Sequence, residues 1–459
     1  MDKLEKLRPV GNLEKLSAVR HPMRYYLNVA HSANYTVPET FTLPLKEYVY
    51  KAVETLIARH PVLSAIILDE DTEEPYFVRL PEVDLAEPIS FQKRAQSFPS
   101  PDERDSELES FLQTQHDTGF TAPKPFWRLI ILTADPDDRR FTAIFVYHHA
   151  LGDGTSGKAF HRTFLQALRD TASLKPDEAK RVVTSPKTPL LPNLEAAHPL
   201  PISIPYLVKT LLKELFFSKQ DPKVWAGAAH QFPMTTQIRT LVLPAAQTSA
   251  LVKICRDHST TVTCALQTAI ARSIFTHIPD KYTRVAFSGA ISSRAWLEEK
   301  ITDEEIGVWV QEFDELYSRK AMTKPTFPWA EAKRSRQTIT KELKQQSKNT
   351  SVGLLKYIKD FRTELFEPKI GKPRKLTCEV SSLGVVKTEN PGDGSLPQMD
   401  RVVFSQSASV TGSAMEFSVI TGADGCLALG VAWQTGIVEE DLVQGIIDTL
   451  KKELDQLCA

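Results

Sequence analysis

The stretch Tyr147-His148-His149-Ala150-Leu151-Gly152-Asp153-Gly154 places two adjacent histidines immediately before a turn that contains two glycines. It continues an apolar run over residues 141–148 that has the length of a β-strand. Residues 156–168 follow, with large apolar side chains every four residues, as on one face of a helix. The histidine pair is therefore predicted to lie between a strand and a helix, where active-site groups are often held by rigid elements on both sides.

His149 is the candidate general base of this stretch. An imidazole has an unperturbed pKa of about 6.5, so at cellular pH it is mostly neutral and can accept a proton. Acyl transfer from a thioester to a hydroxyl needs such a base, together with donors for the oxyanion that develops. His149 would take the hydroxyl proton and deliver it to the departing thiolate, without a covalent acyl-enzyme. The alternative is a buried histidine whose hydrogen bonds are satisfied by its neighbours at a strand end.

The residues around His149 are predicted to support it. Asp153 can accept backbone N–H groups within the loop and pair with a distant arginine, which would fix the direction of the imidazole. Gly152 and Gly154 permit φ angles that other residues avoid, and they leave room for substrate beside the histidine. Since side chains alternate along a strand, His148 is expected to point to the opposite face and to serve packing or hydrogen bonding.

Composition narrows the class of protein. The 459 residues are 42% hydrophobic and 25% charged, as in a globular chain with two or three cores. A formal net charge of -1, with no basic stripe, argues against nucleic acid as a partner. The five cysteines include no CxxC pair, so we predict neither a disulfide framework nor a metal site. With a charged first segment and no long apolar run, we expect a cytoplasmic, monomeric protein without an integral membrane segment.

Prolines divide the chain. Seven of them fall between residues 175 and 205, and each removes an N–H and biases the preceding residue toward extended geometry. We interpret residues 175–205 as a crossover linker between an N-terminal lobe, residues 1–174, and a C-terminal lobe, residues 206–459. Both lobes mix helices and strands, which predicts an α+β fold. Helices are predicted over residues 45–59, 156–168, 245–258, 261–275 and 439–457, and strands over residues 62–68, 76–80, 126–133, 141–148, 237–243, 284–291, 377–381 and 426–433.

Residues 204–217 have leucine, isoleucine, valine and phenylalanine at helical spacing, with Lys209 and Lys213 on the opposite side. One interpretation is a helix that lies on a membrane surface. The other is a helix that packs on the C-terminal lobe or lines an acceptor cavity. The second is favoured because only two basic residues accompany the apolar face.

The segment at residues 147–154 resembles the HHxxxDG signature of the superfamily that shares a chloramphenicol-acetyltransferase-like fold. That superfamily includes nonribosomal-peptide condensation domains, plant BAHD acyltransferases and fungal alcohol acetyltransferases. Further stretches resemble the fungal alcohol acetyltransferases in particular, and their order along the chain strengthens the likeness. These stretches are residues 8–15 (RPVGNLEK), 18–21 (AVRH), 352–357 (VGLLKY), 379–384 (EVSSLG), 404–406 (FSQ) and 433–436 (WQTG). The resemblance therefore covers residues 8–445.

The resemblance implies two similar mixed α/β lobes that meet at a central tunnel, with His149 in the middle. An acyl-CoA, acetyl-CoA in the alcohol acetyltransferases, would enter from one mouth and the alcohol from the other, and no bound cofactor is implied. It also implies that Asp153 points away from the substrate and pairs with an arginine of the second lobe. Arg294, at the end of a predicted strand, is the candidate for that arginine, and an exposed strand-end arginine is the alternative.

The chain departs from the family pattern in two places. Ser382 stands where the family commonly has an asparagine in its EVSNLG stretch, and the DFGWG motif of the plant BAHD branch is absent. Polar side chains near these stretches are candidates for binding substrate or CoA. For Gln406, Ser407 and Thr411, a plain strand-and-turn interpretation is also open. The candidates are Ser381, Ser382, Gln406, Ser407 and Thr411.

Three functions remain in view. The favoured one is an acyl-CoA-dependent O-acyltransferase, specifically an O-acetyltransferase, that acts on a small alcohol or a hydroxylated secondary metabolite. The alternatives are a condensation-type acyltransferase that takes its acyl group from a carrier-protein thioester, and a non-catalytic binding protein of the same fold. A hydrolase is disfavoured because the sequence has no GxSxG stretch.

Overall fold

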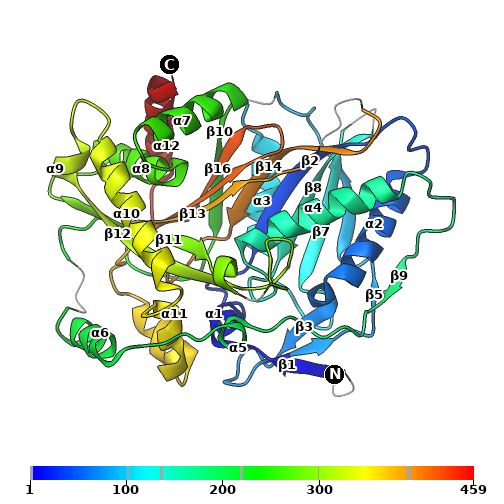
Figure 1. Ribbon diagram of the computed structural model, residues 1–459, viewed down its shortest axis with the longest axis horizontal. Coiled ribbons are helices and arrows are strands. Elements are labelled where there is room, and N and C mark those ends of the chain that lie inside the picture. Colours follow the sequence, from blue (N-terminus) through cyan, green and yellow to red (C-terminus); the bar gives the residue numbers. More distant parts are fainter. Residues whose placement is uncertain are drawn as a thin grey trace.

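The computed structural model describes residues 4–100, 103–134, 138–217, 221–297, 299–389 and 394–458, without the side chains of residues 213–217. Two lobes, each built on a large sheet covered by helices, lie side by side (Figure 1). The predicted fold class, α+β with two mixed lobes, is confirmed.

The N-terminal lobe is built on a five-stranded sheet. Neighbouring strands are antiparallel except for β6 and β7, which are parallel. Helix α4 (Gly154–Asp170) packs on this sheet and against α2 (Leu45–Arg59). Phe160 of α4 stacks on Phe145 of the sheet with 3.7 Å between ring centroids. In order across the sheet, the strands are β14 (Gln398–Gln406), β2 (Val29–Thr36), β8 (Arg140–Tyr147), β7 (Trp127–Thr133) and β6 (Ile89–Lys93).

The C-terminal lobe is built on a six-stranded sheet. Its helices α8 (Val262–His277) and α12 (Glu440–Cys458) pack on each other, with α7 (Ala245–Asp257) and α10 (Trp329–Gln345) beside them. Their apolar faces and the sheet form one core that contains Phe287, Phe417 and Trp433. In order across the sheet, the strands are β10 (Thr236–Leu243), β16 (Leu427–Gln434), β15 (Met415–Thr421), β13 (Cys378–Val385), β11 (Arg284–Ser292) and β12 (Val310–Ser318).

Strand β14 connects the two lobes. It comes from the C-terminal half of the chain, yet it pairs with β2 at the edge of the N-terminal sheet. It also contacts β15 and β16 of the other sheet, where a Cβ on Gly430 would lie only 2.5 Å from the backbone oxygen of Phe404. The two sheets therefore approach each other closely at a glycine. The division near residues 175–205 separates the halves of the chain, but not the sheets.

The proline-rich segment runs along the surface in extended form and contains two short elements. Strand β9 (Val182–Thr184) pairs with β5 (Glu82–Asp84), and Asn193 caps α5 (Leu194–Ala197). A third, small sheet has the order β1 (Glu5–Pro9), β4 (Tyr76–Arg79) and β3 (Ala65–Leu68). The remaining helices are α1 (Asn12–Arg20), α3 (Ser106–His116), α6 (Ile204–Phe217), α9 (Arg319–Met322) and α11 (Ser351–Leu354).

Most predicted elements are confirmed, with small shifts at their ends. The predicted strand over residues 62–68 is wrong in its first half, because Pro61 begins a 3₁₀ turn over Pro61–Ser64 and the strand starts at Ala65. Strands β7 and β8 form the predicted hairpin. Within its connecting turn, residues 135–137 lie outside the described part of the chain.

Helix α6 has apolar side chains both on the side that faces a cavity of the protein and on its outer side. Leu207 and Thr210 line the cavity that contains His149, in agreement with the favoured interpretation of this helix. Its outer side is also apolar: Ile204, Val208 and Leu212 are exposed, Ile204 by 77%. Of the helices in the described ranges, none combines the length and the apolar character needed to cross a bilayer.

Candidate active site

A cavity of about 790 Å³ lies between the two lobes. Its wall contains residues from both halves of the chain, among them Arg20 and His149 of the N-terminal half and Glu379 and Ser381 of the C-terminal half. Apolar side chains such as Leu13 fill other parts of the wall. A cavity with mostly apolar walls and a few convergent polar groups is the usual form of a small-molecule site.

His149 lies at this cavity because strand β8 ends at Tyr147 and α4 begins at Gly154. Its Nδ1 is buried, which leaves Nε2 as the ring nitrogen accessible from the cavity. Burial, and next the positive charge of Arg20, lower the pKa of His149 to about 4. The imidazole is therefore neutral at physiological pH and can accept a proton at Nε2.

Asp153 is held by hydrogen bonds on both carboxylate oxygens. Nη1 of Arg294 donates to Oδ2 at 2.7 Å and Nη2 donates to Oδ1 at 3.0 Å. Oδ2 also accepts the backbone N–H of Trp309 at 3.0 Å, and Oδ1 accepts the backbone N–H of Ser156 at 3.2 Å, as the N-cap of α4. Burial alone would raise the pKa of Asp153, but Arg294 and these donors hold it below its ordinary value. Asp153 is thus occupied in fixing the loop and is not available as a base.

This ion pair joins the lobes next to His149. Arg294 follows β11 of the C-terminal lobe, and both side chains are buried. The backbone N–H of Asp153 donates to the carbonyl oxygen of Gly307 at 3.0 Å, which adds a second connection between the lobes. Arg294 therefore takes the partner position that the family resemblance implies, rather than that of an exposed strand-end arginine.

His148 belongs to a separate buried cluster behind the cavity. Its Nε2 lies 2.9 Å from Oε1 of Glu70, and Nδ1 of His21 donates to Oε2 of the same carboxylate at 3.2 Å. The other ring nitrogens accept backbone N–H groups: Nδ1 of His148 from Ala150 at 3.0 Å, and Nε2 of His21 from Phe120 at 2.9 Å. These backbone donors fix both tautomers, so that in each ring the protonated nitrogen is the one near Glu70. His21 hydrogen-bonds to the carboxylate, whereas Nε2 of His148 lies at ion-pairing distance from it without hydrogen-bond geometry.

The distances alone would allow His21, Glu70 and His148 to hold a metal ion, because one ligand atom from each lies within 4.8 Å of the others. A metal would need the ring nitrogens that face Glu70 to be free of protons. The protons would then sit on the nitrogens that face the backbone N–H groups of Ala150 and Phe120. Two opposed N–H groups repel each other, so the backbone favours the tautomers that place ring N–H groups near Glu70 over a metal site.

We expect Glu70→Gln to lower the free energy of unfolding by about 1–3 kcal/mol, because the amide NH₂ would face one of the two ring N–H groups. Burial raises the pKa of Glu70, but His148 and His21 outweigh it and lower this pKa to about 2. A carboxyl whose folded pKa is depressed adds stability that is present above its unfolded pKa of about 4.3 and is lost as the pH falls toward 2. Urea unfolding of wild type and Glu70→Gln should therefore show a difference in the free energy of unfolding that becomes smaller below about pH 4. A difference independent of pH would contradict this role.

Three of the five predicted binding residues line the cavity: Ser381, Ser382 and Gln406. Tyr26 donates its hydroxyl proton to Oε1 of Gln406 at 3.0 Å, and Oγ of Ser381 donates to Oε1 of Glu379 at 2.9 Å. Nε2 of Gln406 lies 3.5 Å from the same Glu379 oxygen. These side chains therefore form one polar wall that crosses from the N-terminal to the C-terminal sheet.

The other two predicted binding residues lie elsewhere. Ser407 is buried, and its hydroxyl oxygen accepts the backbone N–H of Leu27 at 3.0 Å. Thr411 lines a neighbouring cavity, and its carbonyl oxygen accepts from Nζ of Lys369 at 3.3 Å. Alternation along β14 explains the first case, because Gln406 faces the cavity and the next side chain faces away from it.

Gly152 and Gly154 were predicted to permit special φ angles and to leave room for substrate, and the structure contradicts the first of these two expectations. Neither has a positive φ, so the expectation of a special backbone conformation is wrong. Both lie in close packing instead, more strictly at Gly152 than at Gly154, where the neighbour is the end of a flexible side chain. A Cβ on Gly152 would lie 2.7 Å from Cβ of Ser156, and a Cβ on Gly154 would lie 2.8 Å from Cδ2 of Leu383, across the boundary between the lobes.

We expect Gly152→Ala to destabilise the protein by about 1–3 kcal/mol and to reduce activity, as overpacking does in other well-packed sites. The new methyl group would displace Ser156, whose hydroxyl donates to Oδ1 of Asp153 at 3.2 Å or to the carbonyl oxygen of Gly307 at 2.9 Å. Thermal unfolding and initial rates would measure the two effects. An unchanged melting temperature with full activity would show that Ser156 can move without cost.

Two residues that line the cavity, Arg20 and Glu379, were not predicted from the sequence, and neither was Tyr26, which hydrogen-bonds to Gln406 beside it. Arg20 and Glu379 lie in stretches that carry the family resemblance, which is the one signal that could have identified them. Tyr26 has no motif around it and contributes through its position next to His149, at 5.6 Å between ring centroids.

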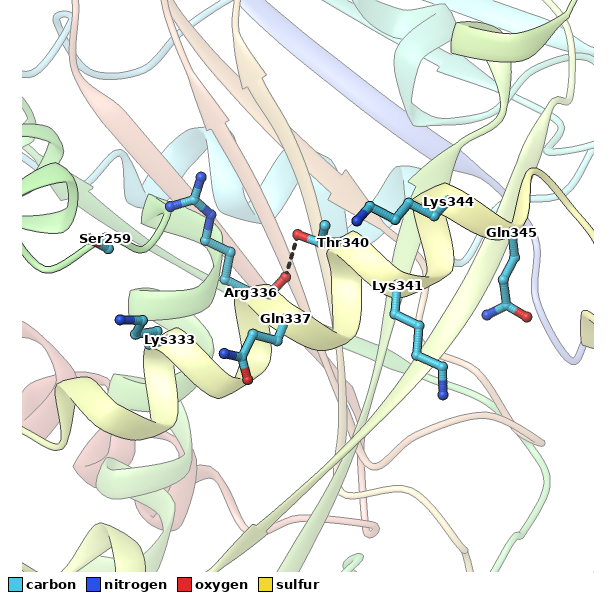
Figure 2. A pocket seen from close by; sticks show the side chains of 8 residues that line it. All are labelled: Ser259, Lys333, Arg336, Gln337, Thr340, Lys341, Lys344 and Gln345. Atoms are coloured by element: carbon cyan, nitrogen blue, oxygen red, sulfur yellow. Dashed lines mark hydrogen bonds between the residues drawn. The ribbon is translucent and has the colours of Figure 1, made fainter.

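A second depression, of about 650 Å³, lies along α10 and shares no residue with the cavity of His149. Figure 2 shows Lys333, Arg336, Lys341 and Lys344 projecting from successive turns of this helix, with Ser259 at one end. α10 packs on α8 and β12. This groove holds no candidate base and is not part of the active site.

The family model for alcohol acetyltransferases matches residues 9–454 of this chain. A protein of Aspergillus fumigatus described as probable alcohol acetyltransferase crmB is 33% identical, over 95% of this chain and 96% of its own length. A protein of Fusarium pseudograminearum described as probable alcohol acetyltransferase FCK4 is 26% identical, over 97% and 94%.

Solved structures share the fold at low sequence identity. The TRI3 trichothecene 15-O-acetyltransferase of Fusarium sporotrichioides superposes with a TM-score of 0.74 at 14% identity, over 98% of this chain and 95% of its own. The first condensation domain of the calcium-dependent antibiotic synthetase superposes with a TM-score of 0.64 at 14% identity, over 99% and 96%. The chain therefore belongs to the alcohol acetyltransferase family and is an acyltransferase of the two-lobed fold that acetyltransferases share with condensation domains.

Proposed function

We propose that this enzyme moves an acetyl group from acetyl-CoA to the hydroxyl of a small alcohol or a hydroxylated secondary metabolite, with His149 as the general base. The observation that carries the proposal is the accessible Nε2 of a neutral His149 in a cavity between the lobes. Acetyl-CoA would act as a dissociable co-substrate, without a bound cofactor or metal, in a cytoplasmic monomer.

The reaction would proceed in two proton transfers through one imidazole. Nε2 of His149 removes the hydroxyl proton as the alcohol oxygen attacks the thioester carbon, and the carbonyl electron pair moves onto the oxygen. When the tetrahedral intermediate collapses, the carbon–sulfur bond breaks and the CoA thiolate takes the proton from the imidazolium. The ion pair between Asp153 and Arg294 holds the loop that directs the ring, and no covalent acyl-enzyme is required.

The relatives support a hydroxyl as the acceptor. Two curated relatives are described as probable alcohol acetyltransferases, and the structural neighbour TRI3 is described as a trichothecene 15-O-acetyltransferase. The cavity of about 790 Å³ has room for an acceptor with a ring system beside the acyl group. Its mixed wall of leucines and hydrogen-bonding side chains suits a molecule with both apolar and hydroxylated parts.

The test is turnover by the purified protein with acetyl-CoA and a panel of simple alcohols and hydroxylated terpenoid or polyketide metabolites. Release of free CoA and the mass of the ester would be followed together, because hydrolysis alone releases CoA without an ester. We expect equal amounts of both products with at least one acceptor. Turnover only with an acetylated carrier protein would favour the condensation-type alternative, and no binding of acetyl-CoA at all would overturn the proposal.

A further inference from the structure

Arg20, the last residue of α1, places a fixed guanidinium on the wall of the cavity that contains His149. Its Nε donates to the carbonyl oxygen of Leu16 at 2.9 Å, and its Nη2 donates to Oγ of Ser17 at 3.3 Å. The carbon of the guanidinium lies 4.6 Å from the ring centroid of Tyr26 and 6.0 Å from that of Phe366. Two hydrogen bonds and two aromatic rings thus hold the group before any substrate arrives.

One edge of this guanidinium is left without a protein partner. Among the described residues, neither a hydrogen-bond acceptor for Nη1 nor a carboxylate within ion-pairing distance of Arg20 is found. Glu379 and Glu312 line the same cavity and attract the cation only from a longer distance. A cation that is removed from water gains strongly from any negative charge that appears beside it.

Arg20 is also close to the reacting centre. The ring of Tyr26 contacts both groups, the guanidinium at 4.6 Å and the imidazole of His149 at 5.6 Å between centroids. Burial is the largest cause of the lowered pKa of His149, and the charge of Arg20 is the next. His148 lowers this pKa by a smaller amount, whereas Asp153 and the backbone carbonyl of His149 raise it. A partial negative charge that develops next to His149 would therefore lie within the field of Arg20.

Two other side-chain donors that line the cavity have protein acceptors. Nζ of Lys158 donates to the carbonyl oxygen of Leu383 at 2.7 Å, and the hydroxyl of Ser381 donates to Glu379 at 2.9 Å. The oxyanion formed during acyl transfer needs preorganised donors in a site with little water, where each donor counts for much more than in solution. Nη1 of Arg20 meets this requirement.

We propose that Arg20 is a catalytic residue that donates Nη1–H to the thioester carbonyl oxygen and stabilises the oxyanion. This inference rests on the proposed function and assigns a second group to the same reaction. As the alcohol oxygen bonds to the carbonyl carbon and His149 takes its proton, the carbonyl π electrons become the oxyanion lone pair beside Arg20. When the carbonyl re-forms, the carbon–sulfur electron pair leaves with the thiolate, which takes the proton from His149. Arg20 keeps all its protons throughout.

Steady-state kinetics of Arg20→Gln and Arg20→Lys provide the first test, with Arg24→Gln as the control for loss of one arginine charge. Arg24 is four residues away, and its Nη2 donates to the carbonyl oxygen of Asp117 at 3.0 Å. We expect Arg20→Gln to lower kcat roughly 10²–10³-fold, with nearly unchanged KM values for acetyl-CoA and acceptor. Arg20→Lys should recover part of this loss in kcat. The Arg24→Gln control should match wild type. A loss confined to the acceptor KM would make Arg20 an acceptor-binding residue and overturn the proposal.

The pH profile supplies a second readout, one that a merely structural role would not move. Since the charge of Arg20 lowers the pKa of His149, Arg20→Gln should raise that pKa and shift the acidic limb of kcat/KM toward higher pH. Arg24→Gln should leave the limb in place. A limb that does not move in Arg20→Gln would show that the guanidinium does not act on the reacting centre.

Infrared spectroscopy separates this inference from the proposed function. Acetyl-CoA labelled with ¹³C at the carbonyl would be bound, without an acceptor, to His149→Ala, in which acetyl transfer is expected to be roughly 10²–10⁴-fold slower. The carbonyl stretch should lie at lower frequency than in free acetyl-CoA, because the donor polarises the bond, and should return toward the free value in His149→Ala with Arg20→Gln. Bound acetyl-CoA with the same frequency in both variants would overturn the role of Arg20 while leaving that of His149 intact. Failure of wild type to bind acetyl-CoA would overturn both.

Discussion

Replacing His149 by alanine should lower kcat/KM for acetyl transfer roughly 10²–10⁴-fold without unfolding the protein, the loss expected for a missing general base. Among the described residues, His149 is the one histidine that lines the cavity, since His148 lies behind it beside Glu70. The alanine variant should still bind acetyl-CoA, because the rest of the cavity wall is unchanged. Measuring CoA release and ester mass together would show the loss of activity, and circular dichroism would check that the variant is folded.

The pH dependence follows from the same residue. A general base must be unprotonated, and burial together with Arg20 lowers the pKa of His149 to about 4. We therefore expect kcat/KM of wild type to be flat from neutral pH down to about pH 5 and to fall below that as His149 takes up a proton. An acidic limb near the ordinary histidine pKa of about 6.5 would mean that the ring is more hydrated during catalysis than the structure shows.

His198→Ala is a suitable matched control for the histidine substitution. His198 lies in the proline-rich segment, where its Nε2 contacts the carbonyl oxygen of Gln346 at 3.1 Å, and it does not line the cavity. It should retain full activity. If His149→Ala released CoA and formed ester as fast as this control, the base would have to be another group and the mechanism proposed here would be wrong.

The centre of the site could be predicted because its chemistry is local in sequence. A strand, a histidine pair, a tight turn and a helix start follow one another within a few residues, and each has a recognisable pattern. The ion pair of Asp153 with Arg294 joins residues 141 positions apart. Only the family resemblance indicated this pair, since neither residue's own neighbourhood specifies its partner.

Other parts of the fold were not predictable because their patterns conflict with their burial. Strand β2 reads Val-Ala-His-Ser-Ala-Asn-Tyr-Thr, with little apolar alternation, yet most of it is buried because β8 and β14 flank it on both sides. Strand β14 gives no local sign that it crosses to the N-terminal sheet. In both cases tertiary pairing decides the structure, and local propensity does not.

The polar groups behind and beside His149 were missed for a related reason. Glu70 was not identified from the sequence, yet it is only 14% exposed and lies between His21 and His148. Arg20 was not identified as a site residue either, and in the structure the rings of Tyr26 and Phe366 lie against its guanidinium. A charged residue reveals its function only once the elements around it are placed.

Arg294→Met should be the most destabilising single substitution near the site, by about 3–5 kcal/mol, because it leaves the carboxylate of Asp153 buried without its partner. Trp309 N–H and Ser156 would still bond to Asp153, but no positive charge would remain beside it. Urea unfolding would measure the loss. Activity should fall as well, since Asp153 lies four residues beyond His149 in the same loop.

A double-mutant cycle distinguishes loss of the ion pair from simple loss of packing. Asp153→Asn removes the buried charge while nearly keeping the shape, so in the background of Arg294→Met it should restore part of the lost stability, with a coupling energy on the order of 3 kcal/mol. The depressed pKa of Asp153 sets the pH range: its contribution is present above the unfolded value of about 3.9 and is lost as the pH falls through the lower folded value. Strictly additive losses in the cycle at neutral pH would show that Arg294 stabilises the lobes by contacts with Trp309 and Gly307, not through Asp153.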